Sequence, residues 1–306
     1  FSRLPVVNKK NELVGIISQG DIFRKLMQNE LPQLEREKYA EFVGRHYDLM
    51  VNWDKRLEYE FPILFREFKK NSIQSILDLG IWTGEYTVRL AKEGITKIIG
   101  VDHNKSMIEI ANKKLHKLSP ADKKRVKVLL SDFSDISGKI SEKLDAAICM
   151  GNSLPYIPLD LPLLFKQVGK VLRKKNAVLI LQVINFEKIL KTKDRLLSFI
   201  IQPCNIEKQT EHLFIEFFDA GKDKYELLHH VIIFDNDGKN WVFKGITTIP
   251  IFYYRKSYIE DCLKKEGFSD ITLAGNMGEY QGDYGQLSFT EPFKPLESDW
   301  MNFLAV

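Results

Sequence analysis

The chain has 306 residues and a net charge of +4, and it contains 44% hydrophobic and 28% charged residues. These proportions are those of an ordinary globular protein. The small positive charge is spread over lysine pairs that are typical of solvated helix ends, so we do not expect a nucleic-acid partner. No apolar stretch approaches the ~20 residues that a helix needs to cross a bilayer, so a membrane protein is not expected either.

Three cysteines, Cys149, Cys204 and Cys262, lie far apart in the sequence and lack metal-ligand spacing. An odd number of cysteines argues against a disulfide framework. No secretory signal opens the chain, and we expect a protein of the reducing cytoplasm that binds no metal. The first residue is Phe1 rather than methionine, which indicates a fragment of a longer chain.

Residues 1–29 have the pattern strand, turn, strand, helix. Pro5-Val6-Val7 leads into a polar turn, Leu13 to Ile17 form the second strand, and Ser18 is a suitable N-cap for the helix. The pattern "PVV…LVGIIS..D" resembles the second half of a CBS domain, whose first half is absent. In that family Ser18 and Asp21 would hold a nucleotide ribose, so a complete CBS module would add an adenine nucleotide as a ligand. Half of the motif cannot close a nucleotide cleft by itself, and we favour the capping role for Ser18.

Residues 30–70 are rich in charge and carry aromatic residues at helical spacing, among them Tyr47, Trp53, Phe61 and Phe65. Aromatic residues in such a pattern are most often core residues of helices. The segment therefore predicts two helices that form a cap and linker before the main domain.

From Ser75 the pattern changes to short apolar strands that alternate with helices. The strands are expected at residues 76–79, 97–101, 126–130, 146–150 and 177–183, and the helices over residues up to 92, 106–117 and 161–172. Such alternation is typical of a parallel sheet covered by helices on both faces. Residues 71–306 are therefore expected to form an α/β domain.

Between residues 211 and 254 the hydrophobic pattern takes a period of two. Three strand-like runs, at 212–218, 225–234 and 241–254, are separated by turns rich in Gly, Asp and Asn, which are hairpin signals. They predict an antiparallel insert, which we place at about residues 196–255. His229 and His230 are neighbours on one of these strands, so we expect them to point to opposite faces. A helix over residues 257–266 and strands near 271–274 and 300–306 complete the predicted sheet.

The residues suited to chemistry lie at the ends of the predicted parallel strands. The first strand runs into a glycine-bearing turn from Asp78 to Gly84, which precedes a helix. Asp102 ends the next strand at about the ~20-residue separation expected for a ribose-binding carboxylate. Asp132-Phe133 follows the third strand and Met150-Gly151-Asn152-Ser153 the fourth. Because the carboxyl ends of parallel strands meet at one edge of a sheet, the pattern predicts a nucleoside-binding site there.

From Tyr47 onward, over about the last 260 residues, the chain resembles the class I S-adenosylmethionine-dependent methyltransferases, and within them the glycine N-methyltransferase and glycine/sarcosine methyltransferase group. The matching residues are Trp53, Arg56 and Glu60; Asp78, Gly80, Thr83 and Gly84; Asp102; Asp132-Phe133; Gly151-Asn152-Ser153; and Asn185 to Leu190. The resemblance implies a Rossmann-like seven-stranded methyltransferase fold, with the antiparallel β-hairpin insert as a lid and the CBS-type β-β-α fragment in front. It also implies an enzyme that methylates a small-molecule acceptor with S-adenosylmethionine as its cofactor.

The resemblance assigns roles to individual cofactor-binding residues. Arg56 would hold the carboxylate of the cofactor, Gly80 would line its methionine part and Asp102 would bind its ribose. The adenine would be surrounded by Asp132, Phe133 and Met150. The other expected cofactor-binding residues are Tyr47, Trp53, Asp78, Ile81, Gly84, His103 and Met107.

For the acceptor, Asn152 would be the catalytic residue that orients it, and Asn185 and Tyr254 would be further contacts. Two positions depart from the family, because the middle glycine of the turn is Trp82 and Ile184 stands where the glycine-using enzymes have an arginine. Without that arginine, an amine less polar than glycine is the expected acceptor. We favour the interpretation that Trp82 turns aside against the N-terminal helices and that cofactor binding survives.

Two alternatives stay open. In the first, Trp82 disables catalysis, and the chain is a regulatory protein that binds S-adenosylmethionine or a nucleotide and is linked to a CBS module. The second is methylation of RNA or protein, against which the absence of an Asn-Pro-Pro-Tyr motif and of a basic stripe counts. The identity of the acceptor and the oligomeric state are not determined by the sequence.

Overall fold

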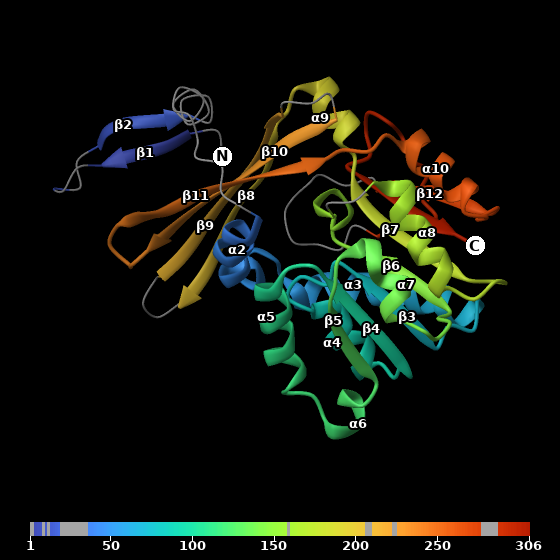
Figure 1. Cartoon of the computed structure of the whole chain (residues 1–306). Coiled ribbons are helices and arrows are strands. Elements are labelled where there is room, and N and C mark those ends of the chain that lie inside the picture. Colours follow the sequence, from blue (N-terminus) through green and yellow to red (C-terminus); the bar gives the residue numbers. More distant parts are fainter. Residues whose placement is uncertain are drawn as a thin grey trace.

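The computed structural model describes residues 3–7, 10, 13–18, 36–157, 160–205, 210–221, 225–276 and 287–306. These residues form a seven-stranded sheet, a four-stranded sheet and a two-stranded pair (Figure 1). Among them, no helix combines the length and the apolar character needed to cross a membrane.

The seven-stranded sheet has the order β12-β13-β7-β6-β3-β4-β5. Its parallel strands are β3 (Ser75–Leu79), β4 (Lys97–Asp102), β5 (Val126–Leu130), β6 (Ala146–Cys149) and β7 (Val178–Ile184). β13 (Trp300–Ala305) runs antiparallel to β7, and β12 (Ile271–Ala274) runs antiparallel to β13. Every residue of β6, β7 and β13 is buried, as expected for strands covered on both faces. The predicted α/β fold is confirmed, and each strand of this sheet lies within one residue of its predicted bounds.

Helices cover both faces of this sheet. One face packs against α3 (Trp53–Lys70), α4 (Glu85–Lys92) and the end of α5 (Lys105–Leu115). The other packs against α7 (Ile136–Lys139), α8 (Leu161–Val171) and α10 (Lys256–Lys265). Side chains alternate between the faces, so that Ile76 belongs to the first core and Leu77 to the second. The short helices α6 (Pro120–Lys123), η1 (Phe133–Asp135), η2 (Leu154–Tyr156) and α9 (Phe186–Thr192) lie in the connections.

The four-stranded sheet, which we call the lid, has the order β11-β10-β9-β8 and is antiparallel. Its strands are β8 (Leu196–Asn205), β9 (Thr210–Ala220), β10 (Glu226–Asn236) and β11 (Trp241–Phe252). The three predicted runs correspond to β9, β10 and β11, whereas β8 was not predicted as a strand. β8 is an edge strand with Pro203 in an irregular part of its register, where the missing N–H of proline is tolerated.

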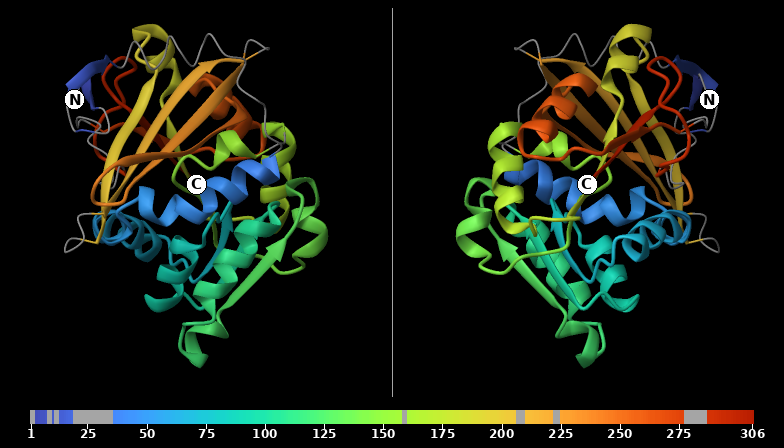
Figure 2. Two further views of the ribbon diagram at one scale, coloured as in Figure 1. Left: turned by 90° about the vertical axis from the view of Figure 1, so that its left-hand side faces the viewer. Right: turned by 90° about the vertical axis from the view of Figure 1, so that its right-hand side faces the viewer.

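Helix α2 (Arg36–Met50) lies between the lid and the seven-stranded sheet (Figure 2). It contacts α5 on one side and β8 and β11 on the other. Val43 and Met50 of α2 share a hydrophobic core with Phe214, Val231 and other residues of the lid. The two predicted N-terminal helices are thus present as α2 and α3, and the first of them joins the two sheets.

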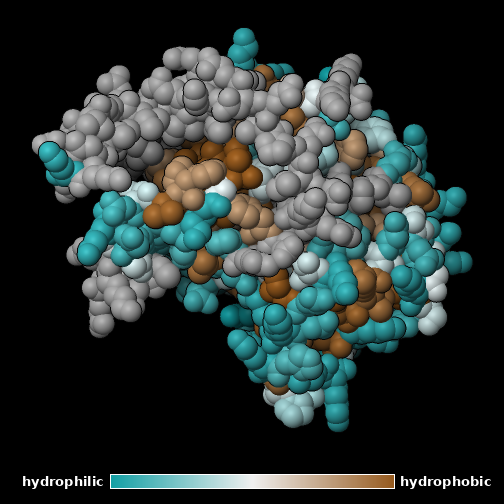
Figure 3. Space-filling view, turned by 60° about the vertical axis from the view of Figure 1, so that its left-hand side comes forward, coloured by the Kyte–Doolittle hydropathy of each residue, from teal (hydrophilic) through white to brown (hydrophobic). Residues whose placement is uncertain are grey.

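At the N-terminus, β1 (Arg3–Val7) and β2 (Leu13–Ser18) form an antiparallel pair, which confirms the predicted strand-turn-strand pattern. The helix predicted after Ser18, with Asp21, lies outside the described residues. The lower part of the molecule in Figure 3 carries mostly hydrophilic side chains, with hydrophobic ones in scattered groups, as is normal for a solvated surface.

Candidate active site

A cleft opens at the carboxyl ends of β3 and β4, beneath the lid. It is lined by Gly80, Trp82, Asp102, His103, Asn104, Met107, Phe133, Ser153, Tyr156, Ile157 and Ile249. The predicted convergence of strand ends is therefore present, and the lining includes the predicted residues Gly80, Asp102, His103, Met107 and Phe133.

Asp102, the last residue of β4, ties the two loops at the base of the cleft together. Its Oδ2 accepts a hydrogen bond from the Trp82 N–H at 3.0 Å, and its Oδ1 accepts one from the Asn104 N–H at 2.9 Å. Burial raises the pKa of the Asp102 carboxyl to about 6, and these backbone hydrogen bonds limit the rise. Each carboxylate oxygen can accept a further hydrogen bond, so Asp102 is suited to bind a pair of hydroxyl groups.

The turn after β3 brings backbone close to the cleft. Gly80 has φ +68°, and a Cβ there would lie 3.0 Å from the Cβ of Ser153. Gly84, the N-cap of α4, has φ +84°, and a Cβ there would lie 2.9 Å from the Cβ of Ala111. Both positions therefore require glycine. Ile81 is buried against α5, so Ile81 and Gly84 shape the turn and do not line the cleft.

Trp82 occupies the middle of this turn with φ +49°, a left-handed conformation that side chains other than glycine rarely take. Its ring stacks on Tyr47 of α2, with centroids 5.1 Å apart and planes at 18°. It also meets Tyr156 edge to face, with centroids 5.2 Å apart. The predicted contact with the N-terminal helices is confirmed, and the ring in addition forms part of the cleft wall.

Arg56 lies in a buried polar network behind the cleft. Its Nη2 donates to Oε1 of Gln182 at 2.9 Å, and its Nε donates to the Tyr86 hydroxyl at 3.2 Å. Glu60 completes the network, because its carboxylate accepts from Tyr86 and from Nε2 of Gln182. The guanidinium passes close to Gly151, where a Cβ would lie 3.3 Å from Nη2. Contact of Arg56 with the cofactor carboxylate stays a prediction, since Nε and Nη2 donate to the protein here.

Tyr47 and Trp53 cover the glycine turn from α2 and α3. Their rings lie 5.9 Å apart, and Nε1 of Trp53 donates to Oδ1 of Asp48 at 3.2 Å. Asp48 also accepts from the Thr83 hydroxyl at 2.7 Å and pairs with Lys114 at 2.6 Å. The two aromatic residues therefore hold the turn in place, and neither lines the cleft.

Three other predicted cofactor residues lie near the cleft without lining it. Asp78 is buried within β3 and accepts from the Thr87 hydroxyl at 2.6 Å, and burial raises the pKa of its carboxyl to about 7. Asp132 is exposed and caps η1, and hydrogen bonds from Ser134 lower the pKa of its carboxyl. Met150 is buried in the sheet core. Their contact with the cofactor stays a prediction.

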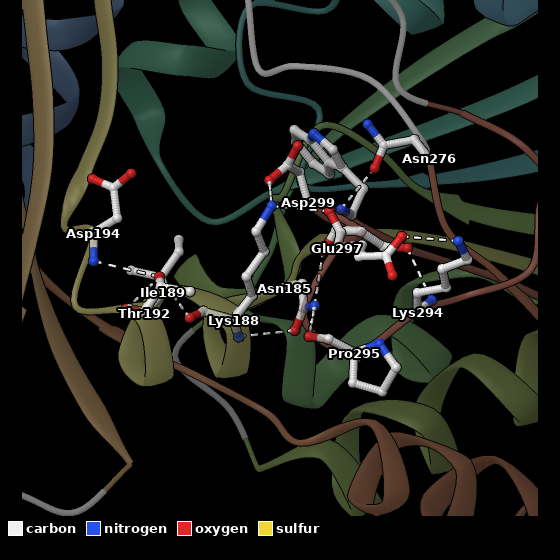
Figure 4. Close-up of polar contacts among 12 residues, drawn as sticks. Asn185, Lys188, Ile189, Thr192, Asp194, Asn276, Lys294, Pro295, Glu297 and Asp299 are labelled. Atoms are coloured by element: carbon white, nitrogen blue, oxygen red, sulfur yellow. Dashed lines mark hydrogen bonds and ion pairs between the residues drawn. The ribbon is translucent and has the colours of Figure 1, made fainter.

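Contact of the predicted residues Asn152, Asn185 and Tyr254 with an acceptor also stays a prediction. Oδ1 of Asn152 accepts from the Ile184 N–H at 3.0 Å and so joins the ends of β6 and β7. Asn185 donates from Nδ2 to the carbonyls of Pro295 and Ser298 at 3.0 and 2.9 Å, and caps α9 (Figure 4). Tyr254 stacks on Tyr258. The three side chains do not line the cleft, because both asparagines satisfy buried backbone groups instead.

Four lining residues were not predicted: Asn104, Tyr156, Ile157 and Ile249. Asn104 is the N-cap of α5, since its Oδ1 accepts from the Met107 N–H at 3.2 Å. Tyr156 and Ile157 follow the Gly151-Asn152-Ser153 turn closely, a signal that could have identified them. Ile249 comes from the lid, and nothing in its local sequence distinguishes it from other core residues of β11.

Comparison with known proteins agrees with this geometry. A family model described as "Methyltransferase domain" matches residues 76–175, and a CBS domain model matches residues 1–28. The chain is 23% identical over 265 residues to a glycine/sarcosine N-methyltransferase of Parasynechococcus marenigrum, covering 83% of each chain. It is 24% identical over 250 residues to a glycine/sarcosine N-methyltransferase of Aphanothece halophytica, covering 80% of this chain and 84% of that one.

Solved structures show the same fold. An S-adenosylmethionine-dependent methyltransferase from Clostridium acetobutylicum superposes with a TM-score of 0.59 at 18% identity, covering 88% of this chain and 97% of that one. The CcbJ methyltransferase from Streptomyces caelestis superposes with a TM-score of 0.60 at 15% identity, covering 89% and 98%. The domain match and the relatives show that residues 76–175 are a methyltransferase domain, and the solved structures show that the chain has the fold of S-adenosylmethionine-dependent methyltransferases.

Proposed function

We propose that this chain transfers a methyl group from S-adenosylmethionine to an amine of a small molecule, and that both reactants meet in the cleft beneath the lid. The observation that carries the proposal is Asp102, a buried carboxylate held by the amides of Trp82 and Asn104 at the mouth of the glycine turn. The methyl donor supplies the reactive group. The protein then has to align the acceptor and exclude water, and proximity lowers the barrier by several kcal/mol.

The lining suits the parts of the donor. Asp102 would accept hydrogen bonds from the ribose hydroxyls, and Phe133 with His103, whose rings lie 5.6 Å apart, would pack against the adenine. Gly80, which has no room for a side chain beside Ser153, would let the backbone pass close to the methionine part.

The acceptor end of the cleft favours an amine on an apolar body. Trp82, Tyr156, Ile157 and Ile249 are aromatic or aliphatic, and apolar pockets bind apolar parts of ligands. The curated relatives are named as glycine/sarcosine N-methyltransferases, which supports an amine as the methylated group. Ile184 is buried in the core shared with the lid, so no ionic partner for a substrate carboxylate comes from that position.

Calorimetric titration with S-adenosylmethionine tests the donor assignment. We expect micromolar binding by the wild type and a loss of roughly ten- to a hundredfold in Asp102→Ala, because charge-assisted hydrogen bonds contribute about 1.5–3 kcal/mol. The control is Asp54→Ala, which removes an exposed carboxylate from the first turn of α3 and should bind as the wild type does. Absence of binding by the folded wild type would end the proposal.

A methyl-acceptor screen by mass spectrometry tests the second part of the proposal, that the methyl group is transferred to an amine. The panel contains phenethylamine, benzylamine and cyclohexylamine, with glycine and sarcosine for comparison. We expect faster transfer to the apolar amines. Retained binding of S-adenosylmethionine with no transfer to any amine would instead favour the regulatory alternative, which the position of Trp82 in the cleft wall and the CBS match at residues 1–28 support.

A further inference from the structure

Behind the acceptor end of the cleft, three polar side chains from different elements form a line. The hydroxyl of Tyr156, from η2, lies 2.7 Å from Nδ1 of His229 on β10. Nε2 of His229 lies 3.2 Å from Oε2 of Glu216 on β9. Tyr156 lines the cleft, so the line leads from the cleft into the lid.

The surroundings of His229 fix its ring. Its cross-strand partners are Phe218 on β9 and Ile249 on β11, and its ring lies 4.7 Å from that of Phe218. Its side chain is 3% exposed. Because Ile249 itself lines the cleft, His229 lies on the face of the lid that covers the cleft.

The titratable groups facing this line are few among the described residues. Tyr156 approaches from η2 and Glu216 from β9, while β11 contributes the apolar Ile249. Tyr47 of α2 is near Glu216; burial raises the pKa of Tyr47 to about 12, and the charge of Glu216 adds to the rise. Glu216 also accepts from the Ser198 hydroxyl at 2.7 Å, which holds its carboxylate beside His229.

An amine acceptor creates a chemical need at this place. Alkyl amines are protonated in neutral water, since the reference pKa of such a group is about 10, and an ammonium has no lone pair with which to attack. A base within hydrogen-bond reach of the acceptor must therefore remove a proton before transfer. In the cleft, Asp102 is already held by two backbone amides, and His103 lies against Phe133, where the adenine would pack. A phenol alone is a weak base.

We propose that Tyr156, His229 and Glu216 form a proton relay that deprotonates the acceptor amine. One N–H bond of the ammonium breaks and its proton passes to the Tyr156 oxygen, while the phenolic proton passes to Nδ1 of His229. The positive charge of the imidazolium that forms is stabilised by the Glu216 carboxylate, whose Oε2 lies 3.2 Å from Nε2. The freed nitrogen lone pair then forms the N–C bond as the S–C bond breaks, and no other reactant is needed. Tyr156 would be the catalytic residue, and His229 and Glu216 act through it. This inference rests on the proposed amine transfer.

The neighbouring residue, His230, provides a matched control. Its side chain is 2% exposed, its Nδ1 lies 2.8 Å from the Thr248 hydroxyl, and its Nε2 lies 3.4 Å from Oδ2 of Asp219. Its ring stacks on Phe217 with centroids 4.5 Å apart. His230 thus has a hydroxyl, a carboxylate and an aromatic partner as His229 does, but on the opposite face of the lid, as predicted for neighbours on a strand.

The test is the pH profile of kcat/KM for transfer from S-adenosylmethionine to the fastest amine of the panel. We expect the wild-type profile to level off near neutral pH. In His229→Gln and Tyr156→Phe we expect a rate roughly a hundredfold lower at pH 7, within the range of general-base catalysis. These variants can use only the small fraction of amine that is unprotonated in solution. Their kcat/KM should therefore rise about tenfold per pH unit, without a plateau near neutral pH. His230→Gln should keep the wild-type profile.

Two further outcomes separate the possibilities. Equal losses in His229→Gln and His230→Gln, with the profile unchanged in shape, would show a loss of lid stability and overturn the relay. If the wild type transfers the methyl group and His229→Gln has the same pH profile as the wild type, the relay is overturned but the proposed function stands. If the wild type transfers it to no amine, both are overturned.

A spectroscopic measurement gives a readout that does not depend on turnover. Nitrogen-15 NMR of the histidine rings, with S-adenosylhomocysteine present, should show His229 with its proton on Nε2 and with Nδ1 as an acceptor. Tyr156→Phe should shift the Nδ1 resonance of His229 and leave that of His230 in place. A spectrum that places the ring proton of His229 on Nδ1 would contradict the relay.

Discussion

Trp82 combines an unfavourable backbone with favourable ring contacts. A left-handed φ costs a residue with a side chain about 1–2 kcal/mol, and Trp82 has φ +49°. Two aromatic contacts, with Tyr47 and Tyr156, offset this cost, since such pairs contribute about 0.5–1.5 kcal/mol each beyond burial. The indole therefore stays against α2 and η2 and forms a wall of the cleft.

From this balance we predict the effect of Trp82→Gly. Glycine relieves the backbone cost but removes both ring contacts and the burial of the indole, so the free energy of unfolding should fall by about 1–2 kcal/mol. The affinity for S-adenosylhomocysteine should stay within threefold of wild type, as measured by calorimetry beside urea denaturation. Trp241→Gly, which removes a half-exposed indole on the lid, is the control. A tenfold gain in affinity would show instead that the indole obstructs the donor.

Asp78 gives a pH-dependent prediction. Burial raises the pKa of its carboxyl from 3.8 to about 7, so between these values the folded protein holds a proton that the unfolded chain has lost. By linkage, the contribution of Asp78 to stability is present at low pH, falls as the pH rises through this window, and is lost above pH 7. Asp78→Asn keeps an oxygen for the Thr87 hydroxyl and removes the buried charge.

We therefore expect Asp78→Asn to unfold at the same denaturant concentration as the wild type near pH 4, and to be more stable by ~2–4 kcal/mol at pH 8. Asp145→Asn should behave in the opposite sense. Burial opposes the charge of Asp145, but hydrogen bonds from Gln74 and Ser75 outweigh it and lower the pKa of its carboxyl. Denaturation series at several pH values measure both differences, and a constant difference between Asp78→Asn and wild type would refute the assignment.

At the scale of the elements, the parallel sheet was predictable because its central strands are buried on both faces and have continuous apolar sequences. The part of the cleft lining that follows the parallel strands was predictable for a related reason. Gly80, Asp102 and Phe133 follow successive strands, and parallel topology alone brings such positions together. β8 was not predicted, because an edge strand that contains a proline lacks the alternating pattern of its neighbours.

The part of the cleft lining that the lid contributes was not predicted, and the reason is topological. Ile249 reaches the cleft, and His229 reaches Tyr156, only because the lid folds back over strands that lie far away in sequence. Asn152 and Asn185 were expected at the acceptor, but an amide at a strand end can equally bond to nearby backbone, which both of them do. Arg56 shows the same limit, since Glu60, Tyr86 and Gln182 come from three separate elements.

At the scale of the whole molecule, the cleft lies between two sheets that share part of a hydrophobic core. Gly80 and Asp102 come from the seven-stranded sheet, Tyr156 from η2 and Ile249 from the lid. α2 lies between the sheets and packs against both sides (Figure 2). A ligand that fills the cleft would therefore contact both sheets, and it should restrain the lid as well as the loops that bind it.

Hydrogen–deuterium exchange with and without S-adenosylhomocysteine measures this coupling. We expect slower exchange in residues 79–84, 101–107 and 153–157, and also in residues 247–251 of β11, because these segments contain the cleft lining. Residues 119–125 around α6 lie away from the lining and should be unaffected. Ligand at a hundred times its Kd stabilises the whole fold by about 2.7 kcal/mol, which slows every amide that exchanges through global unfolding. The comparison therefore uses only amides that exchange fast, through local opening. Protection confined to the seven-stranded sheet would show that the lid does not contact the donor. Asp102→Ala at the same ligand concentration should reduce the protection of every segment, because its affinity is lower.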